Sequence, residues 1–172
     1  MTIDDWIIWL PEDGKQWFWT PQNVRNVLSY GCEVFMRGDY KAKDFNLSVT
    51  TNYTVSVSKT RKKNHKDDGS YMRQIPYVPK YKWNTRLSVK YKKHFFAYQV
   101  SYFDKRFLTT DESYSTPAYT VHNLLAGSSF DIGNIRISPQ VRIDNLFDTY
   151  YESTKYYPMP LRNCLMSGVF EF

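Results

Sequence analysis

The stretch Phe45-Asn-Leu-Ser-Val-Thr-Thr-Asn-Tyr-Thr-Val-Ser-Val-Ser58 alternates strictly between two sets of side chains. One set is apolar except for Thr51, and the other contains only Asn, Ser and Thr. Successive side chains of a β-strand point to opposite faces, so the pattern predicts a strand with one apolar and one polar face. The stretch is also longer than the ~9–11 residues that a tilted strand needs to cross a bilayer.

The same alternation recurs along the chain, and no segment shows a convincing helical period. Apolar and polar side chains alternate from Thr85 to Lys92, from Phe96 to Tyr102 and from Ile135 to Asp144, with Pro139 as an irregularity. The chain is therefore predicted to be all-β and antiparallel, with about eight long strands. Their expected ranges are 4–10, 27–40, 44–58, 83–92, 95–106, 117–131, 134–145 and 161–172.

The expected connections between these strands alternate in length. The short ones are 41–43, 93–94 and 132–133, and the long polar ones are 11–26, 59–82, 107–116 and 146–160. This alternation places every long loop at the same end of the sheet, as in outer-membrane barrels with short periplasmic turns and long external loops. Long strands and alternating connections together favour a transmembrane β-barrel segment.

In a barrel of this kind the apolar faces meet lipid and the polar faces line a wet interior. Aromatic residues near the expected strand ends fit the girdles at the two membrane interfaces. They are Tyr30, Trp83, Phe95, Tyr119, Tyr150 and Tyr151. The same alternation also fits an antiparallel sheet with one face in water. A soluble β-sandwich that binds carbohydrate through aromatic loops is therefore a second interpretation.

Composition excludes several other classes. Of the 172 residues, 18% are aromatic, and no apolar run reaches the ~18 residues of a membrane-spanning helix. The net charge is +6, and the segment from Lys59 to Lys82 carries eight basic and two acidic residues. That concentration is typical of one solvated loop rather than of a basic face that tracks nucleic acid, so no nucleic-acid partner is expected.

The sequence offers no chemistry for catalysis, cofactors or metals. It has no glycine-rich phosphate loop, and its histidines, His65, His94 and His122, lack the spacing of a metal site. An enzyme is therefore not expected. The two cysteines, Cys32 and Cys164, do not form a disulfide framework, and the sequence leaves open whether they are bonded to each other.

The end of the chain carries an ordered set of motifs. They are Asn145-Leu146-Phe147-Asp148, Tyr150-Tyr151, Tyr157-Pro158-Met159-Pro160-Leu161-Arg162 and Val169-Phe170-Glu171-Phe172. This series resembles the closing segment of TonB-dependent outer-membrane receptors, although Leu161 stands where that family often has Gly. Upstream segments that resemble the family's strand ends and loops are Trp19 to Val24, Ser29 to Glu33, Ile75 to Pro79 and Pro117 to Val121.

The resemblance implies that residues 1–172 are the C-terminal portion of a receptor barrel of about 22 strands. The chain shows no plug domain and no secretory signal peptide, so a fragment, a truncated product or a split reading frame is expected. A self-contained eight-stranded barrel is the alternative. Phe170 and Phe172 resemble the terminal signal by which such barrels are recognised for assembly.

The resemblance also implies a function in the intact protein. Family members take up scarce nutrients, of the siderophore, cobalamin or glycan class, across the cell outer membrane. We expect the ligand at the external loops, around Trp17, Trp19, Tyr71, Tyr77 and Tyr114. Expected partners are outer-membrane lipid and lipopolysaccharide, the barrel-assembly machinery, the remaining barrel and plug, TonB through that plug, and a small nutrient ligand.

Overall fold

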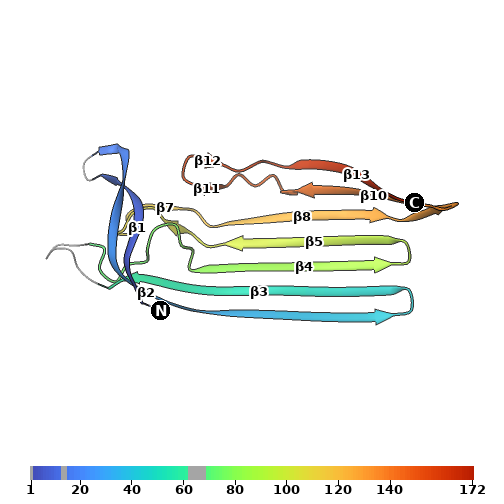
Figure 1. Ribbon diagram of the computed structural model, residues 1–172, viewed down its shortest axis with the longest axis horizontal. Coiled ribbons are helices and arrows are strands. Elements are labelled where there is room, and N and C mark those ends of the chain that lie inside the picture. Colours follow the sequence, from blue (N-terminus) through green and yellow to red (C-terminus); the bar gives the residue numbers. More distant parts are fainter. Residues whose placement is uncertain (1, 13–14, 62–68) are drawn as a thin grey trace. The chain divides into compact units, whose positions relative to one another are not determined.

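The computed structural model describes residues 2–12, 15–61 and 69–172, without the side chains of residues 3–6, 8–19 and 22–25. These residues form strands and connections (Figure 1). Within the described ranges, no helix has the length and apolar character required to cross a membrane. The long strands are β1 (Thr2–Glu12), β2 (Lys15–Ala42), β3 (Phe45–Thr60), β4 (Tyr81–Tyr91), β5 (His94–Phe103), β8 (Tyr119–Ser128), β10 (Ile135–Asp144) and β13 (Asn163–Glu171). The short strands are β6 (Arg106–Phe107), β7 (Ser115–Thr116), β9 (Phe130–Ile132), β11 (Glu152–Thr154) and β12 (Tyr157–Pro158).

The eight long strands form one sheet in the order β1-β2-β3-β4-β5-β8-β10-β13, with β9 paired to β10. This order follows the chain, as in an up-and-down meander, and confirms the prediction of eight long antiparallel strands. Among the described residues, β1 pairs with β2 and β13 pairs with β10, so each leaves one edge open. The sheet is an open barrel segment rather than a closed eight-stranded barrel.

The chain forms two compact units, to both of which β2 and β3 contribute. We call the first the loop unit; it comprises Met1–Cys32, Thr54–Tyr81 and Asp104–Ala118. The second, the sheet unit, comprises Glu33–Tyr53, Lys82–Phe103 and Tyr119–Phe172.

The sheet unit has short turns where the sequence predicts them. Turns follow β2, β4 and β9, and left-handed backbone occurs in them at Lys43, Lys92 and Gly133, with φ of 46°, 52° and 60°. The connection from β10 to β13 is long and contains the β11–β12 hairpin (Figure 1). The predicted alternation of short and long connections is therefore confirmed for these strands.

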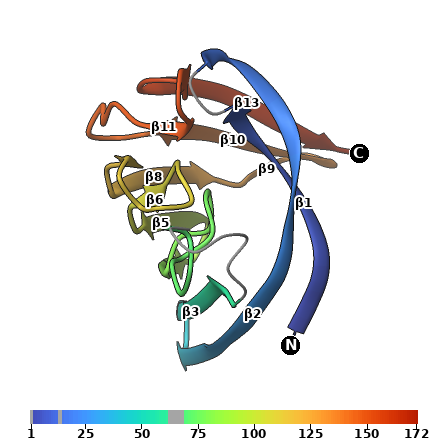
Figure 2. The same cartoon turned by 90° about the vertical axis from the view of Figure 1, so that its left-hand side faces the viewer.

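The prediction of a long loop over residues 11–26 is wrong. Strand β1 extends to Glu12, and β2 already begins at Lys15. The two strands pair from Thr2↔Leu28 to Glu12↔Lys15, and they run side by side in Figure 2. Pro11 and Pro21 suggested a loop, but a proline is compatible with a strand that lacks a full set of ladder hydrogen bonds. Pro21 pairs with Trp9 inside this ladder.

Strand register in the sheet unit gathers the apolar side chains on one face. Phe96 lies opposite Val89 on one side and Ala126 on the other, and Ala126 lies opposite Val141. Val141 in turn lies opposite Met166 on β13. This face is open, because Phe96 is 39% exposed and Met166 is 76% exposed. A sandwich would bury it against a second sheet, so the described structure does not support the soluble interpretation.

The opposite face of the sheet unit carries polar pairs. Asn84 donates to Ser101 Oγ across β4 and β5 at 2.7 Å, and Gln140 donates to Ser167 Oγ across β10 and β13 at 3.0 Å. The register also places Phe95 and Tyr119 on this face, since they alternate with Phe96 and with Thr120. The prediction that Phe95 and Tyr119 belong to the aromatic girdles, which face lipid, is wrong. The position of a residue along its strand sets its depth in the membrane, whereas the register decides which face of the sheet it occupies.

Candidate functional site

The loop unit brings together two connections that are predicted as external loops over 59–82 and 107–116. In the structure they span residues 61–80, between β3 and β4, and residues 104–118, between β5 and β8. The first runs along the last residues of β3, from Ser56 to Thr60, just before β4 begins at Tyr81. Thr60 N–H donates to the Arg73 carbonyl at 3.1 Å, Ile75 N–H to the Ser58 carbonyl at 2.9 Å, and Ser56 N–H to the Lys80 carbonyl at 2.9 Å. Ile75, 2% exposed, packs with Val27 in the small buried core of this unit. The loop is therefore held as a partial extra strand.

The side chain of Gln74 supplies further hydrogen bonds to the last residues of β3. Its Oε1 accepts the Ser58 N–H at 3.0 Å, and its Nε2 donates to the carbonyls of Ser56 and Val78, each at 3.4 Å. Gln74 is 6% exposed, so these backbone groups have little access to water. The side-chain amide of Gln74 thus takes the place of backbone hydrogen-bond partners that the first loop does not provide to these groups.

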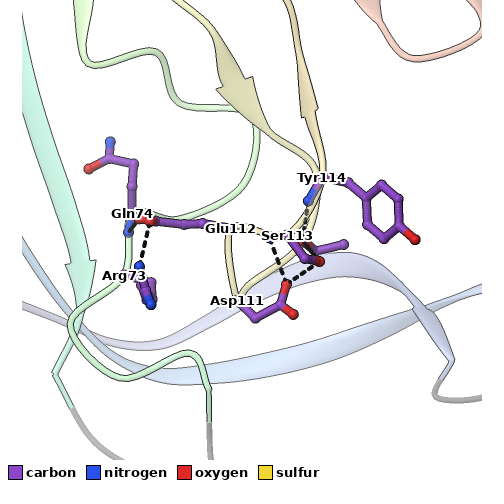
Figure 3. A network of polar contacts seen from close by, with 7 residues as sticks. Arg73, Gln74, Asp111, Glu112, Ser113 and Tyr114 are labelled. Carbon is purple, nitrogen blue, oxygen red and sulfur yellow. Dashed lines mark hydrogen bonds and ion pairs between the residues drawn. The ribbon is translucent and has the colours of Figure 1, made fainter.

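Glu112 joins the second loop to the first (Figure 3). Its Oε1 accepts the Gln74 N–H at 2.7 Å, and its Oε2 accepts from Arg73 Nη1 at 3.0 Å. Glu112 has a φ of 62°, a left-handed conformation that is uncommon for a residue with a side chain. The two loops thus form one connected platform.

The tip of the second loop is a hydrogen-bonded turn around Asp111 (Figure 3). Asp111 Oδ1 accepts from Ser113 Oγ at 2.7 Å and from Ser113 N–H at 3.1 Å, and Ser113 Oγ lies 3.0 Å from Thr109 Oγ1. Hydrogen bonds from the Thr109 hydroxyl, and then from the Ser113 hydroxyl and N–H, hold the pKa of Asp111 below its usual range. The carboxylate is therefore ionised at neutral pH and orders the turn.

The flanks of this tip form the β6–β7 hairpin. Arg106 pairs with Thr116 and Phe107 with Ser115, and the Leu108 N–H donates to the Tyr114 carbonyl at 2.8 Å. Phe107 also accepts, through its carbonyl, the N–H of Tyr77 at 2.9 Å. This bond joins the hairpin to the first loop a second time.

Three predicted contact residues lie on this platform. Tyr71 and Tyr114 are exposed, at 44% and 61%, whereas Tyr77 is half-buried with a φ of 63°. Burial raises the pKa of the Tyr77 phenol, an effect that the nearby Arg106 charge partly opposes. Trp17 and Trp19 lie on β2 rather than in a loop, and their side chains are outside the described structure.

The predicted assembly residues lie at the last strand. Phe170 is opposite Ile137 in the β10–β13 ladder and is 59% exposed, and Phe172 follows the strand at 95% exposure. Cys164, Met166 and Phe170 share one face of β13, because they lie opposite Ile143, Val141 and Ile137.

Sequence reasoning missed Arg73, Gln74 and Glu112 as the residues that connect the loops. No local motif marks them, because their partners are far away in sequence. In the described residues, no group of three or more His, Cys, Asp or Glu side chains is placed to bind a metal ion. Cys32 and Cys164 are both exposed free thiols.

These features define a class of protein: an antiparallel barrel wall with an apolar outer face, in which long connections are held together by hydrogen bonds and alternate with short turns. The family model for "TonB dependent receptor-like, beta-barrel" matches residues 1–146, and the chain belongs to this family. No curated protein shows a significant sequence match to the chain.

Solved structures share the fold. The siderophore receptor PiuA from Acinetobacter baumannii superimposes with a TM-score of 0.69 at 20% identity, over 94% of this chain and 24% of that one. BauA, the ferric preacinetobactin receptor of the same organism, gives 0.59 at 13% identity, over 86% and 27%. The ferric yersiniabactin uptake receptor FyuA from Yersinia pestis gives 0.51 at 14% identity, over 99% and 34%. The chain thus spans about a quarter to a third of the length of these receptors.

Proposed function

We propose that the chain forms the C-terminal part of the outer-membrane wall of a TonB-dependent receptor and presents loops that contact its nutrient. Membership of the barrel family and the fold of siderophore receptors support this proposal. A siderophore-class iron chelate is the substrate that we favour over cobalamin or a glycan, because all three solved structures described above are named as receptors for iron chelates or siderophores.

The observation that carries the proposal is the platform of two hydrogen-bonded loops on which Tyr71 and Tyr114 lie. Aromatic rings supply large contact area with few side-chain torsions to immobilise, and here they project from loops held by Gln74 and Glu112. A platform that is ordered before binding costs less conformational entropy on binding than two independent loops do. The intact receptor also requires TonB and a plug, the barrel-assembly machinery, and the lipid and lipopolysaccharide of the outer membrane as partners.

The test uses the full-length receptor that contains residues 1–172. We expect the double variant Tyr71→Ala, Tyr114→Ala to weaken binding of its ferric siderophore by about tenfold or more, as aromatic contact residues commonly do. Tyr91→Ala is the matched control, because Tyr91 is 49% exposed and precedes the short turn after β4. Unchanged binding of the chelate by the double variant would contradict the role of the platform.

Membrane insertion is tested separately. The protein is expected to reach its strand content in detergent micelles and not in plain buffer, because the apolar face of the sheet unit is open. A cooperative monomeric fold in buffer would contradict the proposal and restore the soluble interpretation. A ligand panel of ferric chelates, cobalamin and oligosaccharides then identifies the nutrient class.

A further inference from the structure

The loop unit contains a cavity of about 330 Å³. Its apolar wall is formed by Tyr30, Val57, Val78 and Phe107. Lys59, Lys80 and Lys105 line it as well, so the cavity combines an apolar surface with three cations. Such a combination suits an amphipathic anion rather than a neutral molecule.

The strand alternation shows which face the cavity occupies. On β3, Ser58 belongs to the polar face, and its Oγ lies 2.8 Å from Ser29 Oγ on β2. Val57 and Lys59 are the neighbours of Ser58 and point to the opposite face. That is the apolar face, which the sequence pattern assigns to lipid. Tyr30 follows Ser29 and therefore belongs to the same face as Val57.

The cavity also has two carboxylates, of which Glu112 is paired with Arg73, whereas the Asp104 charge acts on Lys80. Glu112 accepts from Arg73 and from the Gln74 N–H, and Asp104 Oδ1 accepts the Lys105 N–H at 2.8 Å. Lys80 Nζ lies 5.0 Å from the centre of the Tyr81 ring, and hydrogen bonding to Tyr81 raises the pKa of Lys80. Lys80 is therefore fully cationic at neutral pH. With Glu112 paired to Arg73, three lysines stand against the one remaining carboxylate, that of Asp104, so the net charge of the cavity is positive.

We propose that this cavity binds the phosphorylated head group of a lipid in the outer leaflet. Lys59, Lys80 and Lys105 contact the phosphate, and Tyr30, Val57 and Phe107 pack against the apolar part that follows it. The choice of a lipid over a soluble anion rests on the position of Val57 and Lys59 on the apolar face, and hence on the membrane insertion proposed above. Long lysine side chains reach from an apolar surface to a charged interface, which suits this position.

The experiment places the full-length receptor in detergent micelles doped with bisphosphorylated lipid A and counts retained lipid by native mass spectrometry. The triple variant Lys59→Gln, Lys80→Gln, Lys105→Gln is expected to lose affinity by about ten- to a hundredfold, as removal of several interfacial cations implies. Lys82→Gln is the matched control. Lys82 lies opposite Phe103 and alternates with Trp83, so it occupies the polar face, and it does not line the cavity. It is expected to change affinity by less than about twofold, because a cation on the other face does not meet the head group.

Two further arms identify the source of the phosphate. Dephosphorylated lipid A should bind as weakly to the wild type as lipid A does to the triple variant. Inorganic phosphate should not displace lipid A at concentrations of about 10 mM, since it lacks the apolar part. Equal retention of lipid A by the wild type and the triple variant would overturn the proposal, and so would efficient displacement by inorganic phosphate.

The design separates this site from the proposed function. Heat-modifiable migration on a gel shows whether each variant is folded in detergent, and siderophore binding is measured on the same samples. A folded triple variant that binds siderophore but not lipid A supports the site. A protein that folds in buffer without detergent contradicts membrane insertion itself. A protein that folds in detergent, but whose triple variant retains lipid A as well as the wild type does, contradicts only the lipid site.

Discussion

The carboxylate of Glu112 accepts a 2.7 Å hydrogen bond from the backbone N–H of Gln74, a residue 38 positions earlier in the chain. Gln74 in turn bonds through its side chain to the edge of β3. The second loop is therefore connected to the strand through the first. Order in the exposed tyrosines depends on this chain of contacts, because hydrogen bonds between loops raise the free energy of local opening.

Glu112→Ala is expected to loosen both loops. The substitution leaves the buried N–H of Gln74 without its acceptor, which costs about 1–3 kcal/mol, while Ala has the same restricted backbone at a φ of 62° as Glu. Hydrogen exchange of residues 70–78 should accelerate. Arg73→Ala is the control, because Arg73 is 53% exposed and its ion pair contributes at most about 1 kcal/mol. Equal acceleration in both variants would show that the charge, and not the Gln74 N–H, holds the loops.

Gln74→Met should destabilise the loop unit by about 1–3 kcal/mol although it preserves side-chain volume. The cause is the buried Ser58 N–H, whose acceptor is Gln74 Oε1 at 3.0 Å. Urea unfolding of the detergent-solubilised protein measures the effect. Gln99→Met is the comparison, because Gln99 makes one 3.5 Å contact with Ser101 and is only half-buried. A loss for Gln74→Met no greater than that of the comparison would contradict the role given to the amide.

The turn at Asp111 should be sensitive to acid. Its hydrogen bonds hold the pKa of the folded carboxyl below its unfolded value of about 3.9. A depressed folded pKa contributes stability that is fully present above the unfolded pKa and is lost as the pH falls through the folded pKa. Protection of residues 109–114 from exchange, corrected for intrinsic rates, should therefore fall below about pH 4. Asp111→Asn should remove that pH dependence; an unchanged acid response in this variant would assign it to another group.

Gly127→Ala should destabilise the sheet unit by about 1–3 kcal/mol, as overpacking does. A Cβ at Gly127 would overlap the Phe95 ring and lie 2.6 Å from the Pro139 carbonyl oxygen. Gly38→Ala is the control, because a Cβ there has no neighbour within 4 Å among the described atoms. Since the Pro139 contact is with backbone, adding Phe95→Leu should recover only part of the loss. Full recovery would show that the ring alone excludes a side chain.

Deletion of Phe172 tests the assembly signal. Phe172 is 95% exposed beyond the end of β13, so its removal should leave the unfolding free energy in detergent nearly unchanged. The amount of receptor in the outer membrane of cells should nevertheless fall several-fold. Deletion with no change in membrane yield would reduce Phe172 to an ordinary terminal residue.

Local patterns in the sequence predict most of the long strands and which of their side chains share a face. Alternation such as that of residues 45–58 is a local consequence of backbone geometry, so it predicted β3 and the open apolar face that register confirms. Local signals failed where a partner strand decides the outcome. Residues 15–26 contain Pro21 and are typical of a loop, yet pairing with β1 makes them a strand.

The platform and the cavity, in contrast, depend on contacts between segments that are distant in the sequence. Tyr71, Tyr77 and Tyr114 could be proposed as loop aromatics, but Gln74 and Glu112 gain their roles from contacts across 16 and 38 positions. The cavity likewise gathers Lys59, Lys80 and Lys105 from separate segments. A periodic pattern encodes which way a side chain points, whereas the partner it meets depends on how distant segments pack, and that packing leaves no local signal in the sequence.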